Sequence, residues 1–498
     1  MASEEGRAAV LKRLEVPFTC QNLPILQDML DYEIRCLSEG DIPYFCCTVD
    51  GHAFCGESAD HVLREGYWEQ SPAEVALCRL ERLSPEEKQF EMDYIRTRLD
   101  HAPLPETRVI ECPALPEQAA TAETVRGLCG ELMHQLEQES LRTASGVTIW
   151  YSGLLAIEKD ASCGTATQQA DALLFCSLVL SEPSLAALQP DAARIAEACL
   201  RQIETYAFQI EKESREYLQK TIPLDLAFGL GGILRGVAGA AVAGLKGANA
   251  LLERFLRLIC DNQIYRDQQK TGGEAGLILA LKDLPEGRMP NDMVRELMAG
   301  CGEALLGHEP ADSPMETALR GAALATVSRV CGKDRFAKAA GETFRQVREA
   351  YLPHILGWAE KKPEVAWLAA SSGQEGGIAL CAMIAADALG DGVCTEVREL
   401  ALDSLARKQT LSHSDNLHDG NALSALALTV SAELSGRREN LQLAGRLFAG
   451  MIRRFEANGS FICSPSGVQS FFDVSVCYGT LGIGYAMLAW MKKGEETV

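Results

Sequence analysis

A short glycine motif recurs along most of this chain and constrains its fold more than any other feature. The motif has the form Gly-x-x-Gly followed by Ile or Leu, and an apolar stretch follows each copy. From the clearest copy to the most eroded, the motifs start at Gly229, Gly273, Gly479, Gly321, Gln374, Gly420 and Thr167. Apart from the eroded copy, consecutive motifs lie roughly fifty residues apart, a spacing that accommodates two helices.

A repeat of this length predicts stacked helical hairpins. The apolar stretches are expected to form inner helices, whose glycines let their ends approach one another closely. Amphipathic segments such as Asp292–Gly302 and Gly341–Tyr351 are expected to form the outer layer. Closing the hairpins into a ring would give an all-α, α/α toroid of seven repeats, and an open solenoid is the alternative.

The composition favours helices and excludes some classes of partner. Aromatic residues make up only 6% of the 498 residues, which favours closely packed helices over a β-sandwich. The net charge of −22 repels phosphate backbones, so nucleic acid is not expected as a partner. The longest apolar run, Leu226–Leu245, contains Arg235 and several glycines, so it predicts a core helix and no membrane span.

The 18 cysteines are scattered without paired spacing, and several lie inside apolar runs. Buried thiols of this kind behave as small hydrophobic side chains. The first residues, Met1–Arg7, do not form a signal peptide. We therefore expect a cytoplasmic protein with free thiols.

Residues 1–105 form a first unit that differs from the rest of the chain. Alternating apolar residues on either side of Asp50-Gly51 predict a β-hairpin. A zinc clip there is disfavoured because neighbouring strand residues point to opposite faces; its four ligands would be Cys46, Cys47, His52 and Cys55. Residues 106–118 carry prolines and predict a linker, and residues 119–498 carry the repeats.

The segment Leu411–Asn421 concentrates potential ligands and proton carriers. It contains His413, His418, Asp415 and Asp419, and the apolar run that follows predicts a buried helix. Imidazoles and carboxylates at a helix N-terminus suit a metal, an anion or a general base. The alternative is that Asp419 caps the helix and both histidines are solvated.

The motif copies, in particular the pattern Pro223-Leu-Asp225-x-x-x-Gly229-Leu-x-Gly232-Ile233, resemble the lanthionine cyclase family, LanC. The stretch Gly40-Asp-Ile-Pro-Tyr-Phe45, preceded by Glu33 and Leu37, looks like the end of the dehydratase domain of class II lanthipeptide synthetases, LanM. Ser145–Gly153 fits the start of a LanM cyclase domain. The resemblance covers nearly the whole chain. It implies a small α+β dehydratase remnant over residues 1–105, followed by a LanC-like toroid over residues 119–498.

The resemblance also implies a chemistry. In that family a zinc ion binds a peptide cysteine as thiolate, which adds to a dehydroamino acid and closes a thioether ring. Zinc suits this reaction because it lowers the pKa of the thiol while it keeps an open coordination position. Acid and base groups nearby manage the proton of the enolate.

This chain departs from the family at its functional positions. The three zinc-ligand positions match Ser372, His418 and Asp419, and the catalytic histidine falls near Gly272. Neutral serine is a poor zinc ligand, so no tightly bound zinc or other cofactor is expected, and only weak zinc binding at a degenerate site remains open. The chain also has no glycine-rich phosphate loop with its lysine, so it is not expected to act alone as an ATP-dependent dehydratase.

Other positions of the family are retained. Asp225 matches the family's aspartate, and the last motif is well kept as Val476–Tyr485. The candidate catalytic residues are therefore Asp225, His418, Asp419 and Tyr478, with His413 as an outer candidate. The charged pair Arg453-Arg454 is interpreted as solvated, and Trp150 as a core or rim aromatic.

Three functions follow. The first is a degenerate or split LanM-type subunit in lanthipeptide maturation, which binds a precursor peptide, a partner dehydratase, or both. The second is an active cyclase with a non-standard site, in which His418 acts as the base. The third is a carbohydrate-active α/α barrel with paired carboxylates, drawn from Asp225, Glu274, Glu375 and Asp419.

Overall fold

The computed structural model describes residues 114–138, 140–142, 148–150, 161–266, 271–284, 291–308, 311, 313–353, 357–358, 374–407, 410–412, 414–463 and 472–496. The chain divides into two compact units, Met1–Val109 with Glu139–Thr165, and Ile110–Gln138 with Ala166–Val498. The predicted unit 1–105, including its hairpin at Asp50-Gly51, lies outside the described residues.

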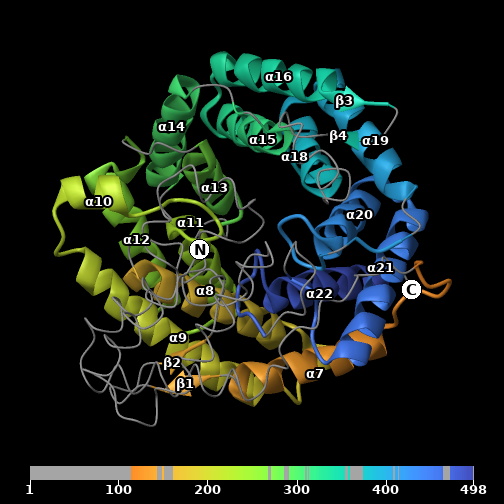
Figure 1. Cartoon of the computed structure of the whole chain (residues 1–498). Coiled ribbons are helices and arrows are strands. Elements are labelled where there is room, and N and C mark those ends of the chain that lie inside the picture. The colour runs from red at the N-terminus through yellow and green to blue at the C-terminus, as the bar shows by residue number, and fades with distance from the viewer. Residues whose placement is uncertain are drawn as a thin grey trace, which may run out of the picture. The chain divides into compact units, whose positions relative to one another are not determined.

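The described residues are mostly helical, so the all-α prediction is confirmed at this level (Figure 1). The α-helices are α7 (Ala122–Gln138), α8 (Ala161–Ser181), α9 (Gln189–Ile210), α10 (Arg215–Thr221), α11 (Leu230–Val242), α12 (Ala248–Asn262), α13 (Thr271–Lys282), α14 (Asn291–Gly307), α15 (Pro314–Cys331), α16 (Asp334–Glu349), α18 (Gln374–Leu389), α19 (Gly392–Ala406), α20 (Asn421–Ser435), α21 (Arg438–Asn458) and α22 (Thr480–Glu496).

The described strands are short. They form two antiparallel pairs, β1 (Leu141–Arg142) with β2 (Thr148–Ile149), and β3 (Tyr351–Leu352) with β4 (Gly357–Trp358). Two 3-10 turns, η2 (Pro183–Leu185) and η3 (Ile264–Arg266), join helices. None of the described helices is long and apolar enough to cross a membrane.

The helix ends follow local capping chemistry. Ser313 accepts a hydrogen bond from the backbone N–H of Met315 at 3.2 Å and so starts α15. Asp391 does the same for Val393 at 2.9 Å and starts α19. At the other end, Gly436 stops α20 with a φ of 68°, in the left-handed region that glycine adopts without steric cost.

Two motif copies do not open a helix, contrary to the sequence prediction. Gly321 lies inside α15, which begins at Pro314 behind the Ser313 cap. Thr167 lies inside α8, which begins at Ala161. Gly321 packs closely against the Phe344 ring in mid-helix, and a small residue there resembles one at a helix start. The eroded copy at Thr167 keeps no glycine, so its match to the motif does not mark a helix start.

The motif-bearing helices pack in chain order. Helix α11 contacts α13, α13 contacts α15, α15 contacts α18, α18 contacts α20, and α20 contacts α22 (Figure 1). Helix α8 contacts members at both ends of this series, because Gly236 of α11 lies against the backbone of Ala170 and Gly484 of α22 lies against the Phe175 ring. A Cβ on either glycine would overlap these neighbours, so the absence of a side chain sets the helix spacing.

The remaining helices are amphipathic and cover this series. Ion pairs join neighbouring members, including Arg254 with Glu211 between α12 and α9, and Arg348 with Glu396 between α16 and α19. Helix α7 packs against α22. Its N-terminal approach is tied to α21 by a hydrogen bond from the Ala120 N–H to the Gly445 carbonyl at 2.8 Å.

Candidate functional site

Three loops that lead into inner helices share one backbone conformation. These glycine loops comprise residues 223–229 before α11, 414–420 before α20 and 473–479 before α22. In each, the first residue of the helix donates its N–H to a carbonyl seven residues earlier. The three bonds run from Leu230 to Pro223 at 2.9 Å, from Asn421 to Ser414 at 2.9 Å, and from Thr480 to Asp473 at 2.8 Å.

A polar side chain at the third loop position holds each turn. Asp225 Oδ1 accepts hydrogen bonds from the N–H groups of Ala227 and Phe228, at 2.8 and 2.7 Å. The equivalent bonds run from His418 and Asp419 to Asn416 Oδ1 at 2.9 and 3.0 Å, and from Tyr478 to Ser475 Oγ at 3.2 Å. Asp225 therefore has a clear structural role as a loop-holding residue.

The final residue of each loop is glycine for a steric reason. A Cβ on Gly229 would lie 2.5 Å from the Pro223 carbonyl oxygen. A Cβ would lie equally close to backbone atoms of the same loop at Gly420 and at Gly479. Real Cβ atoms do not approach other heavy atoms so closely, so the motif's first glycine is required by the loop itself.

The shared conformation places corresponding residues at corresponding points. His418 occupies the position of Cys477 and Ala227, and Asp419 that of Tyr478 and Phe228. These are the two residues before the glycine, at the tip of each turn. The predicted site residues His418, Asp419 and Tyr478 therefore lie at equivalent tips of two loops.

The rings at these tips touch one another. The His418 and Tyr478 rings have centroids 4.4 Å apart, and Tyr478 Oη lies 3.5 Å from His418 Nε2, at the upper limit for a hydrogen bond. On its other side Tyr478 stacks on Phe228 with a centroid distance of 5.6 Å. We refer to Phe228, Tyr478 and His418 as the three-ring cluster. Phe228 was not predicted, although its position directly before a motif glycine could have identified it.

The electrostatics of the cluster favour a neutral imidazole. Loss of hydration around the His418 ring lowers its pKa, and the carboxylates of Asp419 and Glu316 oppose this shift. A neutral imidazole can accept a proton at physiological pH. Asp419 Oδ1 is buried and has no hydrogen-bond partner among the described residues.

Cys477 lies behind the cluster. Its thiol contacts the Leu226 carbonyl oxygen at 3.9 Å. Burial raises the pKa of Cys477 to about 11, although the nearby Arg235 guanidinium lowers it in part. The side chain is therefore a neutral thiol, which argues against a role as a spontaneous nucleophile.

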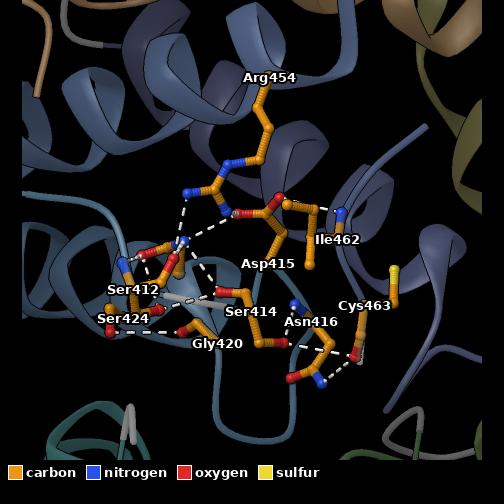
Figure 2. A network of polar contacts seen from close by, with 10 residues as sticks. Ser412, Ser414, Asp415, Asn416, Gly420, Ser424, Arg454, Ile462 and Cys463 are labelled. Atoms are coloured by element: carbon orange, nitrogen blue, oxygen red, sulfur yellow. Dashed lines mark hydrogen bonds and ion pairs between the residues drawn. The ribbon is translucent and has the colours of Figure 1, made fainter. Parts of the chain in front are cut away.

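The rest of the Leu411–Asn421 segment is a buried structural network (Figure 2). Asp415 is fully buried and pairs with Arg454 of α21 at 2.9 Å, while it also accepts from Asn421 Nδ2 at 2.8 Å and from the Ile462 N–H at 3.2 Å. Burial raises the pKa of Asp415, and Arg454 opposes this shift. The prediction that Arg454 is solvated is wrong, because its side chain is buried and paired with Asp415. The amphipathic pattern of α21 could not show this pairing, since Asp415 lies 39 residues earlier in the chain.

The cap predicted at Asp419 is also absent. The N-cap of α20 is Gly420, which has no side chain to cap with. Asn416 satisfies the loop N–H groups instead, including that of Asp419 itself. The carboxylate of Asp419 therefore does not cap α20.

A second buried pair was not predicted. Glu274, which is fully buried in the first turn of α13, places Oε1 3.1 Å from Nε2 of His308 at the end of α14. Burial raises the pKa of Glu274, while the His308 contact opposes this shift. Arg320 of α15 donates to the His308 carbonyl at 3.1 Å, so the pair ties three helices together.

The four carboxylates of the carbohydrate hypothesis occupy different environments. Asp225 holds a loop, Asp419 lies at a loop tip, and Glu274 pairs with a histidine. Glu375 is buried in the first turn of α18. Glu274 and Glu375 hold the same position in their motifs, whereas Asp225 and Asp419 lie in the loops before theirs, so the four do not share one place in the repeat.

The residues implied for zinc do not form a complete ligand set in the described part of the chain. Ser372 and His413 lie outside the described residues, and Gly272 in α13 offers no side-chain ligand. Among the described side chains, no group of three or more His, Cys, Asp or Glu residues could hold a metal ion. His418 and Asp419 alone do not fit a tetrahedral zinc centre.

Comparison with known proteins adds little. No protein-family model matches the chain, and no curated protein matches it. Among solved structures, a sugar epimerase from a ruminal bacterium is 12% identical, and the match covers 66% of this chain and 87% of that one with a TM-score of 0.35. At that TM-score the match supports no argument about fold or function.

Proposed function

We propose that this chain is a degenerate or split LanM-type subunit in lanthipeptide maturation, and that it binds a precursor peptide, a partner dehydratase, or both. The observation that carries the proposal is the set of three glycine loops with one hydrogen-bonding pattern, whose tips gather the three-ring cluster. The loops match the motifs on which the LanC resemblance rests, while the side chains at their tips differ from that family's zinc ligands.

We also propose that the inner helices close into a LanC-like α/α toroid. The contacts of α8 with both α11 and α22 support closure, because these two helices lie at opposite ends of the packed series. An open solenoid would leave α11 and α22 without a shared neighbour.

The tips offer a surface suited to an uncharged or cationic stretch of peptide. Phe228, Tyr478 and a neutral His418 supply ring faces and edges, and beside them Asp419 has a buried carboxylate oxygen without a hydrogen-bond partner among the described residues. Aromatic groups with a few placed polar atoms are typical of peptide-binding sites. A cytoplasmic location agrees with the absence of disulfides among the described cysteines.

Co-purification tests the proposal. The full chain would be expressed with the LanM-type dehydratase and the precursor peptide encoded beside it, and complexes would be measured by size exclusion and mass spectrometry. We expect a complex with at least one of them. For the peptide, Tyr478→Ala should weaken binding at least about tenfold, whereas the exposed His134→Ala in α7 should not. No complex with either partner contradicts the proposal.

The His418–Tyr478 pair favours a second candidate, an active cyclase that works without zinc. His418 would take the proton of a substrate thiol as the sulfur attacks the β-carbon of a dehydroamino acid. The electron pair of the broken double bond would move to an enolate, and Tyr478 would donate a proton to the α-carbon before regaining one from His418. Thiol alkylation of a dehydrated precursor after incubation measures this, and unchanged ring closure in His418→Ala removes His418 from the mechanism.

A further inference from the structure

Arg235 of α11 carries a guanidinium edge that nothing in the described chain satisfies. Its Nε and Nη2 atoms are both buried, and neither has a hydrogen-bond partner among the residues that the structure describes. An unpaired buried charge is strongly unfavourable, which implies that this edge has a partner when the protein is at work.

The unsatisfied edge has the geometry of a carboxylate receptor. Nε and Nη2 project side by side from one edge of the guanidinium plane, and this pair binds a carboxylate through two parallel bonds. The same chain shows this use elsewhere, since Arg254 holds both carboxylate oxygens of Glu211 with its own Nε and Nη2. At Arg235, Nε and Nη2 bind no carboxylate of the described residues.

The surroundings of Arg235 do not supply that carboxylate. Its nearest charged and titratable neighbours are Cys477, Asp171 of α8, Tyr485 of α22 and Asp283 after α13, and it forms an ion pair with none of them. The guanidinium lies near enough to the Cys477 thiol to lower its pKa in part. Asp171, which is buried, instead accepts from the Val476 N–H at 3.0 Å.

We propose that Arg235 is the anchor of an interior site for the carboxylate group of a small ligand, bound bidentately through Nε and Nη2. A monoanionic, planar carboxylate matches the single positive charge and the flat donor edge. A phosphate dianion would leave a negative charge unbalanced in a buried place. This site lies next to Cys477, one of the loop-tip residues, but does not depend on the proposed peptide chemistry.

Asp171 couples this site to pH. Burial raises the pKa of Asp171 to about 7, while Arg235 and the Val476 N–H lower it and Asp473 adds to the rise. An ionised Asp171 competes with a ligand carboxylate for the positive charge of Arg235, and a protonated, neutral Asp171 does not. The ligand should therefore bind more tightly as pH falls from 8 to 6, by up to about tenfold.

Calorimetry and thermal unfolding of the full chain test the proposal, with formate and acetate as probes and, at pH 8 where it is mostly a dianion, inorganic phosphate as the charge control. We expect saturable binding of the two carboxylates and none of phosphate. Arg235→Met should abolish it, and Arg235→Lys should weaken it at least about tenfold because one edge donor is lost. Arg254→Met, which removes the same edge from a surface pair, is the matched control and should bind like the parent.

Asp171→Asn provides the second readout. It should keep carboxylate binding and remove its dependence on pH between 6 and 8. Circular dichroism confirms that each variant is folded, and if Arg235→Met does not fold, Arg235→Lys and Asp171→Asn decide the outcome. Absence of saturable binding in the parent, or equal binding in parent and Arg235→Lys, overturns the proposal, since the edge would then hold only water.

Discussion

At the scale of single residues, Gly420 and Gly479 test the glycine loops most directly. A methyl group on either would lie 2.5 Å from backbone atoms of its own loop, which cannot move without opening the turn. We expect Gly420→Ala and Gly479→Ala to lower the free energy of unfolding by about 2–3 kcal/mol each, measured by urea denaturation. Gly127→Ala in α7 is the control, because nothing lies within 4 Å of its Cβ, and it should stabilise the protein by about 0.5–1 kcal/mol.

The protonation of His418 is the second prediction at this scale. Its folded pKa lies below the ordinary value near 6.5 because of burial, so the neutral ring's contribution to stability is complete above that pH and is lost as pH falls below it. NMR titration of the ring should give a pKa under 6.5. Asp419→Asn should lower it further, since that carboxylate favours the charged form. A pKa at or above 6.5 would contradict the geometry of the three-ring cluster.

How far the sequence could predict the site depends on the residue. The family resemblance points to His418 and Asp419 as ligand positions and to Tyr478 in the last motif, and the shared loop conformation places all three at equivalent tips. Phe228 is harder to predict, because an aromatic residue beside an apolar run also fits a helical core. The sequence shows Arg235 only as an interruption of an apolar run, since no sequence pattern shows which donors of a buried side chain lack a partner.

At the scale of elements, the Asp415–Arg454 pair fixes the loop before α20 to α21. Removing Arg454 would leave a buried carboxylate without its cation, so Arg454→Met should cost about 3–5 kcal/mol at neutral pH. The loss should shrink as pH falls, because Asp415 is then protonated. Urea denaturation at several pH values measures this.

The double variant Arg454→Met with Asp415→Asn separates charge from packing. It should recover part of the lost stability at neutral pH, because no unpaired charge remains. Equal instability of the single and double variants would show that Arg454 acts only by filling space.

Some helix boundaries can be predicted from local sequence alone. Helix α19 begins where Asp391 can cap it, and α20 ends at Gly436, and both signals can be read from the sequence. Helix α15 was predicted to open at Gly321 but begins at Pro314. Gly321 instead admits the Phe344 ring of α16, a tertiary contact that produces the same residue choice as a helix start.

At the scale of the whole molecule, the repeat predicts helices and their order, and it leaves an open solenoid as the alternative to the expected toroid. Closure would depend on contacts between the two ends of the series, such as the bond from the Val476 N–H, in the loop before α22, to Asp171 of α8 across 305 residues. Side-chain periodicity carries no information at such a separation. The number of hairpins and their stacking are local properties. Whether the stack closes into a ring depends on the small rotation between successive repeats, summed over all of them.

Closure has a measurable consequence for cooperativity. Gly484 of α22 and Gly236 of α11 both pack against α8. In a ring, a bulky residue at Gly484 should therefore loosen the packing of α8 against both helices. We expect Gly484→Val to lower the free energy of unfolding by about 2–3 kcal/mol and to raise hydrogen exchange in α8 and α11 as well as in α22. Gly494→Ala, near the end of the same helix with open space around it, should not lower the free energy of unfolding and should not raise hydrogen exchange in α8 or α11. Faster exchange confined to α22 would instead indicate an open solenoid, whose terminal helix frays without disturbing the other end.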